Sequence, residues 1–334
     1  MRKIWGHLLV GLGAFLLVLA PLARWYVAPR LAVAPLGCTT TSAICKDRVN
    51  LSPSSGQAAT MFDPATGTEQ TNVSLVGQER VRADVSASQG PDNRTVWDES
   101  QTLNTSAGTL VSADTMRIPF DGHSSKMIGC CGANTDGTAI TDASGINPLK
   151  FPFGTEQRTY LYYDRTLNKA IAMDFTDVEA IDGVDVYKFV QVIAPTQFGT
   201  QEVPGSLVGS SAPSVQAAQF YANTRTVWVE PTTGVIVKGT EQQKLTLRGA
   251  DGSDKVILID ATISFTADNV RLSAQAAADG KSQLGLVQTV LPLVGLLAGL
   301  VLAVLGVFLV LAGRRGHPSP PAGAHAVREP APTL

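Results

Sequence analysis

The stretch LGLVQTVLPLVGLLAGLVLAVLGVFLVLA, residues 284–312, contains no charged residue and is long enough to cross a membrane as a helix. A membrane-spanning helix needs about 20 mostly apolar residues, because each adds about 1.5 Å of rise and the hydrocarbon core is about 30 Å thick. A second stretch, IWGHLLVGLGAFLLVLAPLA at residues 4–23, meets the same requirement. Trp5, Trp25 and Tyr26 flank it, as aromatic residues do at membrane interfaces. The sequence therefore predicts two terminal transmembrane helices.

A cleaved signal peptide is the alternative for residues 4–23, because the basic residues 2–3 precede the apolar stretch. The candidate cleavage site at residues 32–34 lies far beyond the apolar stretch, and a lipoprotein cleavage before Cys38 is equally late. We therefore expect an uncleaved signal-anchor.

The basic residues beside the helices predict the orientation. Pairs of basic residues at positions 2–3 and 314–315 flank the two helices, and short basic flanks stay in the cytoplasm. We therefore expect a two-pass protein of the plasma membrane with both termini cytoplasmic. Residues 1–3 are then a cytoplasmic N-terminus, residues 313–334 a disordered, proline-rich cytoplasmic tail, and residues 24–283 an extracytoplasmic domain.

The charge of the chain excludes some classes of function. The chain has 334 residues and a net charge of −2, and only 16% of its residues are charged, against about a quarter in a soluble domain. Between the predicted helices, residues 24–281 carry 21 Lys and Arg against 27 Asp and Glu, a net charge of −6. A mildly acidic domain does not attract phosphates, so we expect no nucleic-acid partner.

The cysteines predict disulfides. All four, Cys38, Cys45, Cys130 and Cys131, lie in the predicted extracytoplasmic domain, where thiols become oxidised. Three pairings are open. A bridge between the adjacent Cys130 and Cys131 is one of them, but two bridges from this pair to Cys38 and Cys45 need less distortion, and we expect those. A zinc site is disfavoured by the cysteine spacing and by the presence of only four histidines. We expect no metal and no other cofactor.

Alternating apolar and polar residues predict that the extracytoplasmic domain is mainly β, a barrel or a sandwich with few helices. The clearest hairpin joins residues 176–181 and 184–193 through Asp182-Gly183, a pair suited to a turn with positive φ. Further strands, each bounded by turn residues, are expected at residues 71–76, 94–97, 158–163, 170–175, 224–230, 235–238, 241–248 and 255–264.

Two other segments have a distinct composition. Residues 195–213 are rich in Gly, Ser and Pro, which predicts a long loop. A helix is expected over residues 269–278, with Asp268 as its N-cap and Gly280 at its end.

The sequence contains no catalytic motif of the nucleophile-elbow or zinc-protease type. His123, the single histidine of the predicted domain, lies in a Gly/Ser turn. An extracytoplasmic hydrolase would need His123, or a pair of carboxylates, in a cleft. We therefore expect that the protein is not an enzyme, and the hydrolase stays as an alternative.

Small residues repeat on both predicted transmembrane helices and allow close helix packing. They are Gly295, Gly299 and Ala303 on the second helix, and more weakly Gly6, Gly13 and Ala20 on the first. We expect the two helices to pack on each other through these faces, and a homo-oligomer formed through the helices is a further option.

Two segments of the domain resemble the signature of the actinobacterial PorA family of two-pass envelope proteins. They are KFPFGTE at residues 150–156, followed by Arg158-Thr159-Tyr160 and Tyr163-Asp164, and TVWVEPTTG at residues 226–234. The adjacent cysteines are similar too, and the resemblance spans both helices and most of the domain. The positions that carry it are Lys150, Phe151, Pro152, Phe153, Gly154, Tyr160, Asp164, Trp228, Glu230, Pro231 and Gly234.

The family name implies a channel in the cell wall. An outer-envelope porin, however, is a closed barrel with an apolar band facing the lipid, whereas the two long helical anchors of this chain suit the plasma membrane. The topology also resembles that of the class B scavenger receptors, which hold a lipid tunnel between two spans. We therefore expect a non-catalytic domain that binds envelope lipid or cell-wall polymer and contacts membrane lipids. An oligomeric channel is the alternative.

Overall fold

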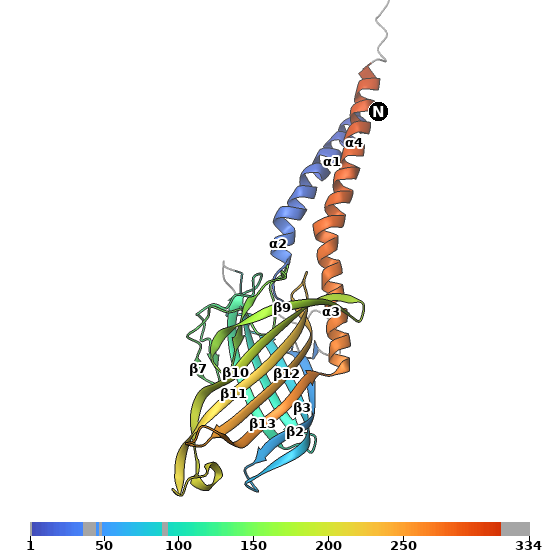
Figure 1. Ribbon diagram of the computed structural model, residues 1–334. Helices are drawn as coiled ribbons and strands as arrows, with labels where there is room; N and C mark the ends of the chain where they lie inside the picture. Colours follow the sequence, from blue (N-terminus) through green and yellow to red (C-terminus); the bar gives the residue numbers. More distant parts are fainter. Residues whose placement is uncertain (1, 36–44, 47–48, 89–92, 315–334) are drawn as a thin grey trace, which may run out of the picture. The chain divides into compact units, whose positions relative to one another are not determined.

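The computed structural model of the chain describes residues 2–35, 45–46, 49–88 and 93–314, so most of the expected cytoplasmic tail lies outside the described residues. The chain divides into two compact units (Figure 1). The first, here called the helical unit, comprises Met1–Pro29 and Gly285–Leu334, and the second, the β unit, comprises Arg30–Leu284.

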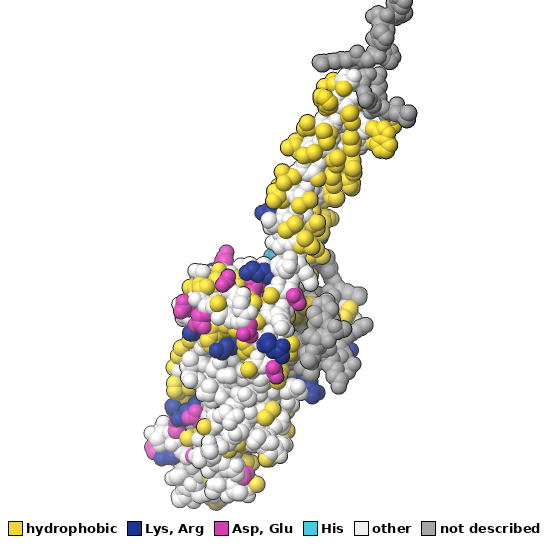
Figure 2. Space-filling view, turned by 90° about the vertical axis from the view of Figure 1, so that its right-hand side faces the viewer, with side chains coloured by type: hydrophobic (Ala, Val, Ile, Leu, Met, Phe, Trp, Pro, Cys, Tyr) yellow, Lys and Arg dark blue, Asp and Glu magenta, His cyan; other side chains and the backbone are white. Residues whose placement is uncertain are grey.

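The helical unit is made of two long, apolar helical runs. One comprises α1 (Arg2–Leu22), the π-helical turn η1 (Ala23–Val27) and α2 (Ala28–Leu31), and the other comprises η3 (Leu286–Val290) and α4 (Leu291–Arg314). Both runs are long and apolar enough to cross a membrane. The side chains on the surface of this unit are almost all hydrophobic (Figure 2). Because such a surface needs an apolar environment, the unit is suited to association with a membrane.

Small residues bring α1 and α4 into close contact. A Cβ atom added to Gly13 would lie 2.6 Å from the carbonyl oxygen of Gly299 and 2.7 Å from the backbone nitrogen of Ala303. A Cβ atom added to Gly295 would lie 3.3 Å from the Cβ of Ala20. The small residues of the two helices therefore face each other within one chain, so an oligomer would have to use other faces of these helices.

The β unit is built on one antiparallel sheet of thirteen strands. They are β1 (Cys45–Lys46), β2 (Val49–Asp63), β3 (Thr68–Ala83), β4 (Arg94–Thr105), β5 (Leu110–Asp121), β6 (Asn134–Thr135), β7 (Thr138–Ala139), β8 (Tyr160–Asp164), β9 (Lys169–Ile181), β10 (Val184–Pro204), β11 (Ser214–Glu230), β12 (Val235–Arg248) and β13 (Asp254–Phe265). The strand order is β7-β6-β5-β4-β3-β2-β13-β12-β11-β10-β9-β8, with β1 paired to β2. Among the strands of the described residues, only β2 and β13 are paired while far apart in the sequence.

The sheet curls into a barrel. The segment between β5 and β8 links these two strands and closes one end of the barrel. Phe120 of β5 bridges Met127, and the neighbouring Lys126 bridges Ile146. Ile146 in turn bridges Tyr162 of β8. The architecture is therefore a barrel rather than a two-sheet sandwich, and the prediction of a mainly β domain is confirmed.

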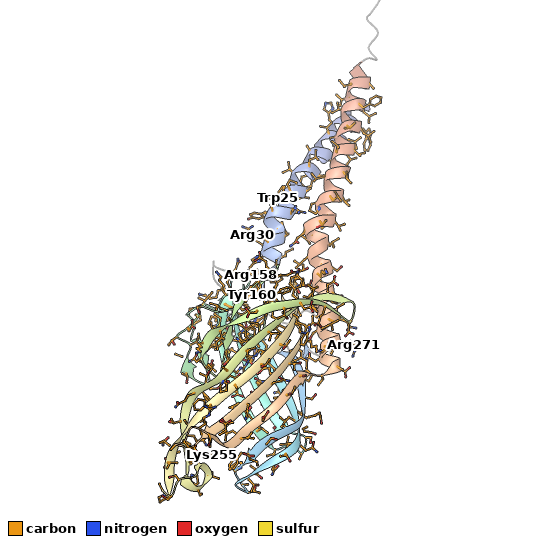
Figure 3. All side chains as sticks on the ribbon, viewed as in Figure 1. Trp25, Arg30, Arg158, Tyr160, Lys255 and Arg271 are labelled. Carbon is orange, nitrogen blue, oxygen red and sulfur yellow. A yellow bond between two sulfur atoms is a disulfide. The ribbon has the colours of Figure 1, made fainter. Side chains whose placement is uncertain are left out.

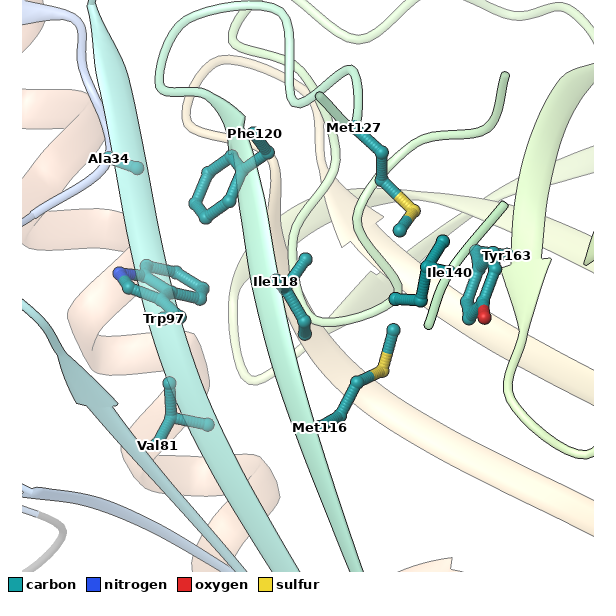
Figure 4. Close-up of a cluster of buried hydrophobic side chains, with 9 residues drawn as sticks. All are labelled: Ala34, Val81, Trp97, Met116, Ile118, Phe120, Met127, Ile140 and Tyr163. Atoms are coloured by element: carbon teal, nitrogen blue, oxygen red, sulfur yellow. The ribbon is translucent and has the colours of Figure 1, made fainter. Parts of the chain in front are cut away.

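Two apolar clusters fill the closed end. The first contains Ala34, Val81, Trp97, Met116, Ile118, Phe120, Met127, Ile140 and Tyr163 (Figure 4). The second contains Ile146, Phe151, Tyr160, Tyr162, Met173, Phe189, Val227 and Val229. The ring of Trp97 meets that of Phe120 edge-on at 4.9 Å. These clusters give the closed end a packed interior.

All the predicted hairpins of the second half of the domain are present, but the expected loop at residues 195–213 is wrong. β10 continues to Pro204, a short 3-10 helix η2 (Gly205–Val208) follows, and β11 begins at Ser214. Register shifts lie between Ile193 and Thr196 on β10. Such a bulge admits Pro195, which cannot donate a ladder hydrogen bond.

The helix after the last strand, α3 (Ala267–Gly285), is longer than predicted. The hydroxyl of Thr266 accepts a hydrogen bond from the backbone of Asn269 at 3.2 Å, so Thr266 rather than Asp268 caps it. Gly280 does not end the helix. Ala274 and Ala277 are buried against β10, β11 and β12, and this packing outweighs the ~1 kcal/mol that glycine costs inside a helix.

The two expected bridges, from Cys130 and Cys131 to Cys38 and Cys45, are both wrong. Cys130 and Cys131 are bonded to each other. The chain turns at this pair, with Cys131 at a φ of 59°, and Arg117 donates a hydrogen bond of 2.8 Å to the carbonyl of Cys131. Cys38 lies outside the described residues, and Cys45 lies in β1.

Candidate functional site

The two sequence segments that resemble a family signature lie against each other at the closed end of the barrel. The backbone nitrogen of Phe151 donates to the carbonyl of Gly234 at 2.9 Å, and that of Thr155 donates to the carbonyl of Pro231 at 2.7 Å. Gly234 has a φ of 73°, and a Cβ atom there would lie 2.1 Å from the carbonyl oxygen of Phe151. Only glycine fits this position, so the two segments lock together.

The contact between residues 150–156 and 226–234 is here called the lock. Buried charged side chains of the same two segments stabilise it. The ammonium of Lys150 donates to the carbonyls of Phe151 at 2.8 Å and of Thr233 at 2.9 Å, and it lies 3.7 Å from the ring centre of Phe153. Burial lowers the pKa of Lys150 to about 7. The carboxylate of Glu230 accepts hydrogen bonds from the backbone and the hydroxyl of Thr233. These side chains bind neighbouring backbone, which is a structural role.

The other signature residues also contact neighbouring structure. Tyr160 accepts a hydrogen bond of 2.9 Å from the backbone of Glu156, and Arg158 lies over its ring at 4.3 Å. Figure 3 shows Arg158 and Tyr160 at one end of the β unit and Lys255, near the β12–β13 turn, at the other. Trp228 packs against α3 in the cluster described above. His123, the alternative catalytic residue, binds the carbonyl of Ala32 at 2.8 Å through Nδ1.

Beyond the packed end, the barrel contains a partly open cavity of about 420 Å³. The inward positions of β4 change from Trp97 through Glu99 and Gln101 to Leu103, and those of β11 change from Val227 through Arg225 to Tyr221. The interior therefore has an apolar end, a polar middle and a second apolar region. We call the polar middle the polar belt; its members are Glu79, Glu99, Gln101, Asp114, Asp164, Arg165, Gln191, Asn223, Arg225 and Glu241.

Arg225 is the centre of the belt on one wall. Its guanidinium lies 2.6 Å from a carboxylate oxygen of Glu241 and 3.2 Å from one of Asp164, and it donates to the amide oxygen of Gln191 at 2.5 Å. Asp164 also accepts a hydrogen bond of 3.2 Å from the hydroxyl of Tyr221. Burial acts to raise the pKa of Glu241, but Arg225 outweighs it and holds that pKa below its usual value.

A second arginine forms a second ion pair in the belt. Arg165, just after β8, lies 2.5 Å from a carboxylate oxygen of Glu99, whose side chain is fully buried. The other oxygen of Glu99, Nη1 of Arg165 and the amide oxygen of Asn223 are buried and have no hydrogen-bond partner among the described residues. A buried polar atom without a partner is costly, and of these three residues Arg165 lines the cavity.

Glu79, Gln101 and Asp114 form one row across β3, β4 and β5. Glu79 is the direct cross-strand partner of Gln101, and Gln101 that of Asp114, and all three line the cavity. Burial, followed by the negative charge of Glu99, raises the pKa of Glu79 to about 8.

The second apolar region lies beside this row. It contains Ala59, Leu75, Leu103, Ile259 and Ala261, with Val111, Leu245 and Ile263 packed against them, and several of these side chains line the cavity. The cavity thus has charged groups on one side and aliphatic groups on the other.

The outer wall of the barrel is polar. On β3, Arg80 and Arg82 are exposed, and Asp98 of β4 and Lys244 of β12 have side chains that are 48% and 41% exposed. On the face of the β unit seen in Figure 2, charged and hydrophobic side chains are scattered and form no continuous apolar band. A strand wall that faces lipid carries a continuous apolar band instead.

Of the polar belt, Asp164 is the one member among the signature residues, and the sequence-based predictions do not include the others. A signal was present. On β4 and β11, Glu99 and Arg225 occupy the same alternation phase as the apolar residues that face the core. A charged residue in that phase indicates a buried polar site.

Comparisons with known proteins give a consistent result. A family model described as Porin PorA matches residues 5–308. A protein named Porin PorA from Corynebacterium resistens is 24% identical, over 72% of this chain and 76% of that protein. Another of the same name from Corynebacterium amycolatum is 26% identical, over 72% of this chain and 77% of that protein.

Two solved structures show weaker likeness. An exported protein with a YmcC-like fold from Bacteroides fragilis is 12% identical, with 64% of this chain and 93% of that chain covered and a TM-score of 0.20. A lipoprotein from Parabacteroides distasonis is 10% identical, with 64% and 92% covered and a TM-score of 0.17. Both TM-scores are too low to support an argument.

Proposed function

Since this chain belongs to the Porin PorA family, we propose that it is a membrane-anchored protein of the cell envelope whose barrel binds an amphiphilic ligand without chemical conversion. The observation that carries the proposal is the cavity of about 420 Å³ inside the barrel. Its volume lies within the range of about 300–1,000 Å³ that is usual for small-molecule sites.

The two sides of the cavity define the class of ligand. The polar belt offers charged and hydrogen-bonding groups, and buried groups of this kind favour a ligand with a polar end. The opposite side, with Leu103, Leu245 and Ile259, offers aliphatic surface. Burial of an alkyl chain there contributes about 0.8 kcal/mol for each CH₂ group. An envelope lipid, or a fragment of one, combines both properties.

The anchoring completes the proposal. Both helical runs have the length and hydropathy of membrane spans. The basic residues at positions 2–3 and 314–315 support cytoplasmic termini and an extracytoplasmic β unit at the plasma membrane. In this arrangement the barrel would bind its ligand outside the cytoplasm while it remains attached to the bilayer.

Equilibrium dialysis of the full chain in a lipid-free peptidisc, with radiolabelled dodecanol as the probe, tests ligand binding. We expect saturable binding of one molecule per chain. Val111→Phe fills the aliphatic side of the cavity and is expected to weaken binding at least tenfold. The matched control, Val76→Phe, changes a residue that is 51% exposed and should bind as the parent chain does. Absence of saturable binding, or equal binding by both variants, would refute the proposal.

Channel formation is the second candidate, because the family and both Corynebacterium relatives carry the name Porin PorA. That name favours a channel over ligand binding. The polar outer wall of the strands and the pairing of α1 with α4 support a pore only between several copies of the chain. Conductance in planar bilayers tests it: channel events should rise more steeply than linearly with the amount of full chain. No conductance at any amount would exclude this candidate.

A further inference from the structure

We infer that the polar end of the ligand is a cation, a primary ammonium group held by Glu79 and Asp114 at the row across β3, β4 and β5. This inference rests on the proposed function, since it assumes that the cavity binds an amphiphile, and it adds the charge and hydrogen-bonding character of that ligand.

The charges of the polar belt are unequally balanced. Arg165 is paired with Glu99 at 2.5 Å, and Arg225 is paired with Glu241 at 2.6 Å and Asp164 at 3.2 Å. Arg165 keeps one donor, Nη1, without a partner. The belt holds five carboxylates against these two arginines, so it has a net formal charge of −3 before a ligand binds.

Two carboxylates of the belt face the cavity without a direct contact, and Arg165 acts on Glu79 only at longer range. Glu79 and Asp114 line the cavity and make no hydrogen bond or ion pair with any residue in the described part of the chain. Their cross-strand partner Gln101 lies between them. Residues directly opposite on neighbouring strands have Cβ atoms about 5 Å apart. Glu79 and Asp114 are two strands apart, so their Cβ atoms are about 10 Å apart, and an ammonium between them, beside the amide oxygen of Gln101, has three hydrogens to donate to these groups.

A second, independent observation also favours a donor. The free carboxylate oxygen of Glu99 and the amide oxygen of Asn223 are buried acceptors without a partner. Both residues are at least 97% buried. Both residues lie just behind the cavity wall: Glu99 is two residues from Gln101 on the same face of β4, and Asn223 lies between Tyr221 and Arg225, and it is Gln101, Tyr221 and Arg225 that line the cavity.

One group in the belt would favour an anion instead. Nη1 of Arg165 is a buried donor without a partner. An anion there would meet the unpaired carboxylates of Glu79 and Asp114, and like charges at this distance repel strongly when they are shielded from water. The balance of charge therefore favours a cation.

The protonation of Glu79 makes binding pH-dependent. Its pKa is raised to about 8, so at pH 6.5 a cation must displace a proton from it, whereas at pH 8.5 the carboxylate is mostly ionised. An alkylammonium keeps its charge over this range, because its pKa is close to that of lysine, about 10.4. The titratable and charged groups that line the cavity are Glu79, Asp114, Tyr162, Tyr163, Arg165, Tyr221, Arg225 and Glu241. Glu99 and Asp164 lie behind them as partners of the two arginines.

Three probes with the same chain length test the inference in the dialysis described above: dodecylammonium, dodecanol and dodecanoate. We expect dodecylammonium to bind at least tenfold more tightly than dodecanol, and dodecanoate to bind most weakly. The affinity for dodecylammonium should rise about tenfold from pH 6.5 to pH 8.5. Glu79→Gln should remove that rise. Asp114→Asn should weaken dodecylammonium binding, whereas its control, Asp260→Asn on the exposed face of β13, should not.

The outcomes separate the two proposals. If dodecanol binds and dodecylammonium binds no more tightly, the cation is wrong and the amphiphile site stands. If dodecanoate binds most tightly, the site belongs to Arg165 and the inference is overturned. If no probe binds, the proposed function fails and the inference fails with it. Glu79→Gln is expected to fold, because removal of a carboxylate with a raised pKa relieves repulsion; its thermal midpoint should be at least that of the parent chain.

Discussion

Removal of Arg225 tests whether the polar belt is held together by its charges. Arg225→Met keeps the length of the side chain but leaves Asp164, which is fully buried, with the Tyr221 hydroxyl and the backbone nitrogen of Leu167 as its donors. Breaking a buried ion pair from one side costs about 3–5 kcal/mol. The other partner, Glu241, has a side chain that is 36% exposed, so water stabilises part of its charge. We therefore expect the free energy of unfolding to fall by about 3 kcal/mol.

Urea unfolding of the full chain in a peptidisc, followed by the fluorescence of the buried Trp97 and Trp228, measures this change. The double variant Arg225→Met/Asp164→Asn leaves no buried charge unpaired at that contact. It should therefore be less destabilised than the sum of the two single variants, with a coupling of about 2 kcal/mol. A loss below 1 kcal/mol in Arg225→Met, or strictly additive single variants, would show that the ion pairs do not stabilise the belt.

Three further predictions concern the lock and the helices. The pKa of Lys150 is lowered to about 7 from 10.5, so between these pH values the unfolded chain binds more protons than the folded chain. The free energy of unfolding of the parent chain, relative to that of Lys150→Met, should therefore rise by about 2 kcal/mol from pH 7 to pH 9 in urea titrations. Parallel pH curves for the two chains would contradict this. Gly13→Leu should separate the helices and speed amide hydrogen exchange in α1, whereas Gly11→Leu, which meets no atom within 4 Å, should not. Gly234→Ala should lower the free energy of unfolding by at least about 2 kcal/mol. Its control, Gly183→Ala, should lower it by about 1 kcal/mol, because Gly183 also has a positive φ, of 80°, but a Cβ atom there meets no atom within 4 Å.

The hairpins were predictable because their determinants are local. Asp182 and Gly183 both adopt positive φ at a turn that joins two strands with alternating patterns. The resemblance to the family was predictable for a similar reason, because it depends on short continuous segments. Residues that close a turn or a lock are determined largely by their immediate neighbours, and one sequence is sufficient to find them.

The failed predictions depend on contacts that a single sequence does not reveal. Gly280 stays inside a helix because the helix packs against the barrel. Pro195 lies in a strand because a bulge releases it from the hydrogen-bond ladder. The cysteine pairing was chosen for low distortion, yet a turn with positive φ at Cys131 places the adjacent sulfurs together. In each case the surroundings supply a stabilisation, or a backbone geometry, that composition does not encode.

The polar belt was missed because its members lie one or two to a strand across most of the barrel wall. Glu79, Glu99 and Arg225 come from β3, β4 and β11, and no spacing rule links them along the chain. The lock and the belt nevertheless meet at one residue. Asp164 ends the strand that the lock positions, and its carboxylate holds Arg225. The family signature at the closed end would therefore act on the cavity indirectly, because it positions Asp164, which orients Arg225. Substitutions in the lock should consequently change ligand binding as well as stability.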